Sequence, residues 1–191
     1  RRVLFRSRNK CQLWNSNFSS KAKVTNKLSG IISGNAVSDY RNVLVISELI
    51  GIISKKMPLE DKIYNILGRI IEITESQYGM LFITKDNNVV RSYSRKIFEK
   101  DWIEAKFYNM NIINSVIEKQ QGIYMIDWDE FGDYDALTGT CDWHSIIAAP
   151  LINSGICKGV LYLSVSTKIK EFNFDNYNFV NTLGEILAAI I

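Results

Sequence analysis

The chain has 191 residues, of which 47% are hydrophobic and 23% charged. These proportions are ordinary for a globular protein and exclude global disorder, a collagen-like repeat and a coiled coil. The three cysteines are scattered and His144 is the single histidine, so the composition excludes a His-rich metal site and disfavours a disulfide framework or a zinc site. No apolar run reaches the roughly 18 residues that a membrane-spanning helix needs.

The net charge of +3 is unevenly distributed along the chain. Residues 1–30 hold eight of the 23 basic residues and no acidic one, so residues 31–191 carry 15 bases against 20 acids, a net charge of −5. The basic leader is rich in Ser, Asn and Lys, which is typical of a solvated tail rather than of a nucleic-acid-binding patch. We therefore expect no direct contact with nucleic acid.

Four segments are expected along the chain. Residues 1–7 are the translation of the DNA sequence AGACGTGTGCTCTTCCGATCT, which is the end of a common sequencing adapter. We expect these residues to be a read-through scar without function. Residues 8–37 are expected to be a linker, residues 38–57 a signalling or dimerisation helix, and residues 58–191 a folded domain. The missing initiator methionine and the apolar end favour a fragment, and the Ile-, Asn- and Lys-rich composition favours an AT-rich bacterial source.

Apolar residues at helical spacing predict two helices before the first strand. The first begins at a cap on Ser38 or Asp39 and runs to about Ser54. Its apolar stripe consists of Val43, Ile46, Leu49, Ile50 and Ile53. The second, over residues 59–75, follows Pro58 and carries apolar residues on more than one face, so it should be well buried.

The period of the apolar residues then changes from helical to alternating. Strands are predicted over 78–84, 89–94, 123–126, 145–152 and 157–165. Residues 97–119 are predicted to be helical in two pieces, and a closing helix is predicted from about Asp175 to Ile191. This order of elements predicts an α+β domain built on an antiparallel sheet.

Three stretches between about residues 40 and 191 form a pattern that is fairly specific in this order. They are Ile70-Ile-Glu-Ile-Thr-Glu-Ser-Gln-Tyr-Gly-Met-Leu-Phe-Ile83, then Ser145-Ile-Ile-Ala-Ala-Pro-Leu151 with Gly159-Val-Leu-Tyr-Leu163, and Phe172-Asn-Phe-Asp-Asn-Tyr-Asn-Phe179. On this pattern residues 58–191 resemble the GAF domain family, small sensory modules of signalling proteins. The resemblance implies a GAF-like α+β fold with a six-stranded antiparallel sheet, the terminal helices on one face and a ligand pocket on the other.

The resemblance also implies a cytoplasmic regulatory domain that senses a small ligand and signals through its terminal helices. The output domain in this family is a histidine kinase, a nucleotide cyclase or an ATPase that activates transcription. The apolar stripes favour a homodimer, with Ile46, Leu49, Ile50 and Ile53 as the seam, although packing of that stripe on its own protomer is the alternative. The sequence identifies neither the ligand nor a cofactor.

Two ligand classes of this family are disfavoured by the residues present. The Asn-Lys pair of cyclic-nucleotide-binding members falls on Val165-Ser166, and their Asp-Glu pair falls on Asn176-Tyr177. The Cys-His pair of bilin-binding members is not matched, because Cys141 is followed by Asp142 and lies close to the next strand. The ligand class therefore stays open.

Six residues are candidates for contact with a ligand. In the loop 127–143, aromatic residues among acidic ones predict a cage for a small or cationic ligand, or else a solvated acidic loop with buried aromatics. The acids of this loop lack EF-hand spacing, which disfavours calcium. Strand alternation places Tyr162 and Ser164 on one face, expected to be the pocket side, and His144 is expected to hydrogen-bond at a strand edge. The candidates are Trp128, Tyr134, Trp143, His144, Tyr162 and Ser164.

Two other functions remain open beside a sensor. One is a ligand-free dimerisation spacer. The other is catalytic, because Cys141-Asp142 resembles the Cys-Asp dipeptide of the free methionine-R-sulfoxide reductases, where the thiolate attacks the sulfoxide. Cys141 lies two residues closer to Ser145 than in that group, and the segment before Ile123 lacks the Gly-x-Cys-Gly stretch that holds the resolving cysteine of those enzymes. We therefore expect a non-enzymatic protein.

Overall fold

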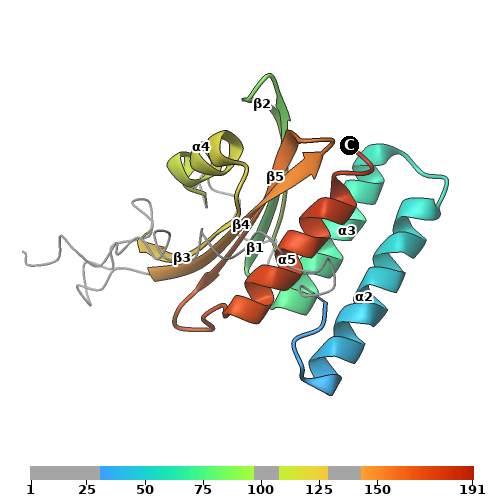
Figure 1. Cartoon of the computed structure of the whole chain (residues 1–191), viewed down its shortest axis with the longest axis vertical. Helices are drawn as coiled ribbons and strands as arrows, with labels where there is room; N and C mark the ends of the chain where they lie inside the picture. The colour runs from blue at the N-terminus through green and yellow to red at the C-terminus, as the bar shows by residue number, and fades with distance from the viewer. Residues whose placement is uncertain (1–30, 97–107, 129–142) are drawn as a thin grey trace, which may run out of the picture.

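The computed structural model describes residues 31–96, 108–128 and 143–191, without the side chains of Lys96, Asp127 and Trp128 (Figure 1). Its helices are α2 (Ala36–Ser54), α3 (Leu59–Thr74), α4 (Met110–Lys119) and α5 (Phe174–Leu187). Its strands are β1 (Tyr78–Lys85), β2 (Asn88–Lys96), β3 (Ile123–Trp128), β4 (Trp143–Asn153) and β5 (Ile156–Ser166). The predicted α+β class is confirmed.

The strands form one antiparallel sheet in the order β2-β1-β5-β4-β3. Both predicted hairpins, β1–β2 and β4–β5, are present. The described residues contribute five strands, where the resemblance implied six. Strands β2 and β3 lie at the two ends of this order, and β5 lies at the centre between β1 and β4.

Helices cover both faces of the sheet (Figure 1). On one face α3 and α5 lie side by side and α2 packs outside them, while α4 covers part of the other face. The alternation of β5 separates the two cores: Leu161 and Leu163 face α3 and α5, and Val160 and Tyr162 face α4. Residues on β4 divide in the same way, so neighbouring residues of these strands belong to different layers.

Gly159 of β5 lies where two strands approach closely. A Cβ atom on this residue would come within 2.3 Å of the Phe82 carbonyl oxygen of β1. A larger residue would therefore push β5 away from β1 at the centre of the sheet.

The helix ends differ from the predicted ones at two places. Helix α2 begins earlier than expected, because the Asn35 side-chain oxygen accepts hydrogen bonds from the N–H groups of Val37 and Ser38, at 3.1 and 3.2 Å. Helix α5 ends at Leu187 rather than continuing to Ile191. The Ala188 carbonyl, which a further turn would use, accepts instead from the Asn153 side chain at 3.1 Å.

The apolar stripe predicted as a dimer seam packs mainly on its own protomer, which corrects that prediction. Leu49 is 0% exposed and lies in the core, and Ile46 and Ile53 pack against the same core. Ile50 differs, with 52% of its surface exposed. The seam was misassigned because α2 carries apolar residues around most of its circumference, so spacing alone does not identify the face that meets α3.

Candidate functional site

A buried polar pair lies on the sheet face that carries α4. His144 is the second residue of β4, and its Nδ1 atom lies 2.9 Å from the Ser164 hydroxyl oxygen of β5. Both side chains are buried. The register explains the contact, because Ser164 pairs with Ile146, two residues beyond His144 on the same face of β4.

Further polar residues extend this face toward the N-terminal end of β1. Tyr78 pairs with Ser164 across the β1–β5 ladder, and its ring lies 6.3 Å from the His144 ring. Ser166, the register partner of His144, is also buried. We call His144, Ser164, Ser166 and Tyr78 the polar pair region. Most of the other buried residues that the structure describes on this face are apolar.

The remainder of the face is closed by α4. The Tyr162 hydroxyl accepts a hydrogen bond of 3.4 Å from the N–H of Asn109, the residue that caps α4. Tyr108 packs edge-on against Phe82 with the ring centroids 5.2 Å apart. Ile113 of α4 completes this apolar packing. Tyr162 therefore joins the sheet to the start of α4 and lies next to Ser164 along the same face.

The sequence-predicted candidates fall into three groups. His144, Tyr162 and Ser164 share the α4 face. Trp143 is 48% exposed and, being adjacent to His144 on β4, lies on the opposite face. Trp128 pairs with Trp143 in the β3–β4 register, and Tyr134 lies outside the described residues. The described residues thus bring three of the six candidates together and separate them from Trp143.

The alternative based on cysteine chemistry falls mostly outside the described residues, because Cys11 and Cys141-Asp142 lie there. Cys157 is described and buried, and its thiol donates to the Gly159 carbonyl oxygen at 3.2 Å. It stands seven residues before Ser164 on β5, roughly 23 Å along an extended strand. Cys157 is therefore remote from the polar pair region.

Sequence reasoning missed the residues that join this region to the helices. Ser145, next to His144, points to the other face, where its hydroxyl accepts a hydrogen bond of 3.0 Å from the buried N–H of Phe172. The Phe172 carbonyl accepts from the Tyr124 hydroxyl of β3. Burial raises the pKa of that Tyr124 phenol. A serine inside an apolar strand was the one sequence signal for this contact.

The β5–α5 connection is also held by α3. Lys170 donates to the Thr74 carbonyl oxygen at 3.1 Å and to the Glu75 carboxylate at 2.9 Å. That hydrogen bond and the positive charge lower the pKa of Glu75. At the start of the same connection, the Ser166 N–H donates to the Gln77 side-chain oxygen at 2.6 Å. The segment leading to α5 therefore contacts β4, the α3–β1 connection and the end of α3.

The described residues form neither a metal site nor a membrane-spanning helix. Among residues 31–96, 108–128 and 143–191, no group of three His, Cys, Asp or Glu side chains is placed to hold a metal ion. In the same residues, no helix is both long and apolar enough to cross a membrane.

No protein-family model and no curated protein matches the chain. Several solved structures are similar to it. The GAF domain of nlh2 from A. aeolicus in an inactive state is 18% identical, with 79% of this chain and 95% of that one covered and a TM-score of 0.53. The GAF domain of a phosphoenolpyruvate-protein phosphotransferase from Coxiella burnetii is 17% identical, with 78% and 92% covered and a TM-score of 0.54.

An enzyme with the same fold is equally similar. The free methionine-R-sulfoxide reductase from Neisseria meningitidis, in complex with its substrate, is 15% identical, with 78% of this chain and 87% of that one covered and a TM-score of 0.56. At these identities the similarity establishes the fold, which regulatory domains and an enzyme share. The described part of this chain has a GAF-like fold.

Proposed function

We propose that the chain is a cytoplasmic sensory domain that binds a small ligand against the polar pair region and signals through its terminal helices. The supporting observation is the adjacency of His144 and Ser145. His144 contacts Ser164 on the α4 face, and Ser145 holds the residue two positions before α5 on the other face. A ligand that displaces β4 at His144 would therefore also displace the hydrogen-bond acceptor of Phe172.

The ligand is proposed to contact His144, Ser164 and Tyr162. These side chains offer an imidazole and two hydroxyl groups, which suit a small polar molecule with both donors and acceptors. Trp128, Tyr134 and Trp143 remain proposed contacts from the β3–β4 side. Of these, Trp143 would reach a ligand only at the edge of the sheet, since it lies on the other face.

A thermal-shift screen of metabolites tests this proposal. A ligand that binds only the folded protein raises its apparent stability, by about 2.7 kcal/mol at 100 times Kd. The Ser164→Ala variant should lose most of that shift, whereas Ser47→Ala on the exposed side of α2 should keep it. A shift that both variants keep would place the ligand elsewhere, and the absence of any shift would favour a spacer.

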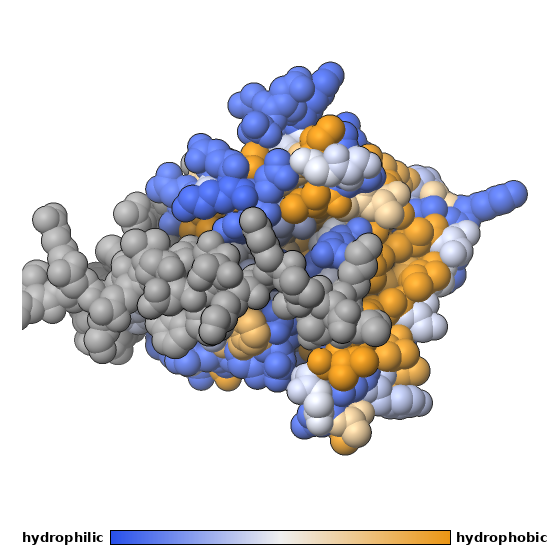
Figure 2. All heavy atoms as spheres, viewed as in Figure 1, coloured by the Kyte–Doolittle hydropathy of each residue, from blue (hydrophilic) through white to orange (hydrophobic). Residues whose placement is uncertain are grey.

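Dimer formation is proposed through the outer side of α2. Five large hydrophobic residues there are exposed, namely Val37, Tyr40, Val43, Leu44 and Ile50. Figure 2 shows hydrophobic residues gathered on the side of the molecule where α2 and α5 lie. An apolar helix face on a sensory domain suits pairing with a second copy, and the helix pair would carry the signal to a histidine kinase, cyclase or ATPase output domain.

The ligand-free spacer is the second candidate. The mutual hydrogen bond of His144 and Ser164 favours it, because two buried polar groups that satisfy each other need no ligand. The reductase is the third, and the shared fold is what keeps it open. Turnover of free methionine-R-sulfoxide with thioredoxin, abolished in Cys141→Ser, would establish the enzyme instead.

A further inference from the structure

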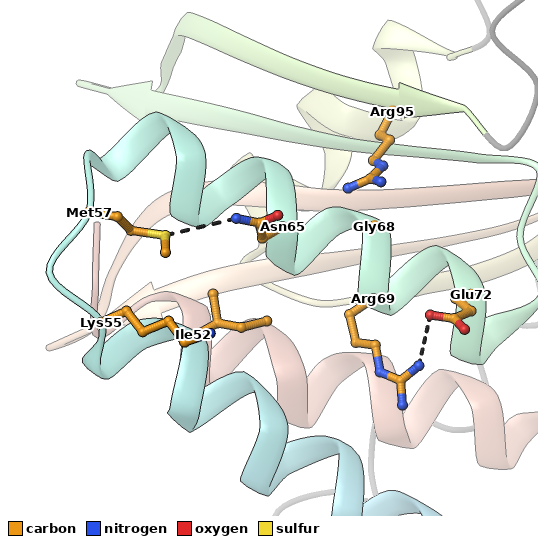
Figure 3. A pocket seen from close by; sticks show the side chains of 8 residues that line it. All are labelled: Ile52, Lys55, Met57, Asn65, Gly68, Arg69, Glu72 and Arg95. Atoms are coloured by element: carbon orange, nitrogen blue, oxygen red, sulfur yellow. Dashed lines mark hydrogen bonds and ion pairs between the residues drawn. The ribbon is translucent and has the colours of Figure 1, made fainter.

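A surface groove of about 390 Å³ lies beside α2 and α3 (Figure 3), and none of its lining residues belongs to the polar pair region. Ile52 lines it from α2, Lys55 and Met57 line it from the α2–α3 loop, and Asn65 and Gly68 line it from α3. Arg95 reaches it from β2. The volume falls within the roughly 300–1,000 Å³ of small-molecule sites.

Arg95 is held in one orientation above the groove. Its Nη1 atom donates to the Tyr64 carbonyl oxygen at 2.8 Å, and its guanidinium carbon lies 4.6 Å from the centre of the Tyr64 ring. The absent side chain of Gly68 makes room for it, because a Cβ there would lie 2.0 Å from Nη1. Glycine is unfavourable inside a helix, so this position is adapted to the guanidinium. Among the described residues Arg95 donates one hydrogen bond, through Nη1, so its other N–H groups are available to another acceptor.

Two of the three cationic side chains that line the groove have no carboxylate partner among the described residues. Within the described part of the chain, neither Lys55 nor Arg95 forms an ion pair. Arg69 differs, since it contacts Glu48 at 2.5 Å and Glu72 at 2.7 Å, and hydrogen bonds to both raise its pKa. Of the described residues that line the groove, Glu72 alone carries a carboxylate, and that carboxylate is directed at Arg69 (Figure 3).

The side-chain amide of Asn65, which also lines the groove, donates to a weak acceptor. Its side-chain N–H donates to the Met57 sulfur at 3.8 Å, as drawn in Figure 3. A thioether is a weak acceptor, so an anionic oxygen in the groove would be a better partner for this amide. Three donors of different elements therefore line one groove with apolar contacts from Ile52 and Met57.

We propose that this groove binds a small organic anion, a carboxylate or a phosphate with a short apolar body. Arg95 binds the oxyanion through its fork of N–H groups, Lys55 adds a second positive charge, and Asn65 donates to the same group. The apolar body of the ligand contacts Ile52 and Met57. Because Lys55 follows α2 and Arg95 belongs to β2, the anion joins α2 to the domain and stabilises its docking on α3.

Amide chemical-shift titrations of the ¹⁵N-labelled chain test the site, with inorganic phosphate and butyrate as probes and chloride at matched ionic strength as the reference. Saturable shifts at Lys55, Asn65 and Gly68 support it. Arg95→Gln should weaken binding at least about tenfold by removing charge-assisted hydrogen bonds. Lys55→Gln, at an exposed position outside the core, should weaken it several-fold without affecting folding. Lys119→Gln on α4 is the matched control and should leave binding unchanged.

Comparing the affinities for the two probes distinguishes a phosphate-bearing ligand from a carboxylate. Tighter binding of phosphate assigns a phosphate-bearing ligand, and tighter binding of butyrate assigns a carboxylate with an apolar body. Glu72→Gln should strengthen the binding of both probes, because it removes a lining carboxylate and one of the two carboxylate partners of Arg69, which keeps its contact with Glu48. Shifts that chloride reproduces, or that persist unchanged in both Arg95→Gln and Lys55→Gln, would overturn the proposal.

Discussion

The Ser145 hydroxyl oxygen accepts a hydrogen bond of 3.0 Å from the N–H of Phe172, although 27 residues separate them. Both residues are fully or almost fully buried. Phe172 stands just before Asn173, whose side chain caps α5. This bond fixes the start of α5 on the strand that carries His144, so the position of α5 depends on the position of β4.

Replacing Ser145 by alanine should destabilise the domain by about 1–3 kcal/mol, since the Phe172 N–H loses its partner in a buried place. Urea denaturation measures the loss. Ser47→Ala, on the exposed side of α2, is the control and should stay within about 0.5 kcal/mol of the parent protein. A Ser145→Ala variant as stable as the control would mean that Phe172 finds another acceptor.

Leu161→Ala should cost roughly 2–5 kcal/mol, because Leu161 is fully buried between the sheet and the helices. Ile169→Ala, at a position that is mostly exposed, should cost much less. Thermal or urea denaturation provides the comparison. A loss below about 1 kcal/mol at Leu161 would contradict its place in the core.

A charge should have different effects on the exposed and the buried side of α2. Ile50→Lys should turn a dimer into a folded monomer, because the exposed face of α2 would carry a charge against the apolar face of the second copy. Leu49→Lys, one residue earlier, should unfold the domain instead, since Leu49 is in the core. Sedimentation velocity and far-UV circular dichroism distinguish the two. A parent protein that sediments as a monomer at high concentration would contradict the proposed dimer.

Glu75 should make the folding stability of the domain depend on pH in the acidic range. Lys170 lowers the pKa of Glu75 in the folded state, so the stabilisation is present at neutral pH and is lost as the pH falls through the lowered folded pKa. Glu75→Gln should therefore be slightly less stable than the parent at pH 7 and equally stable in acid. The effect is small because the Glu75 side chain is largely exposed. A difference that is unchanged in acid would exclude the ion pair as its cause.

The sequence was sufficient for the order of elements, since the change from helical to alternating spacing at Tyr78 and the turns between strands are local signals. Alternation along β5 also predicted that Tyr162 and Ser164 share a face. Other features depend on contacts between distant residues. The seam on α2 was misassigned, since Leu49 and Ile50 are equally apolar and only the position of α3 separates them. The Ser145–Phe172 bond and the placement of Arg95 over Gly68 depend in the same way on tertiary packing.

The most direct test of the sensory account is amide hydrogen exchange with and without a compound identified in the thermal-shift screen. Binding against His144 and Ser164 should slow exchange on β4 and also change it over 172–177, at the start of α5. In Ser145→Ala the change on β4 should remain while the change at α5 is lost. Protection confined to β4 and α4 in the parent protein, with α5 unaffected, would contradict transmission through this contact.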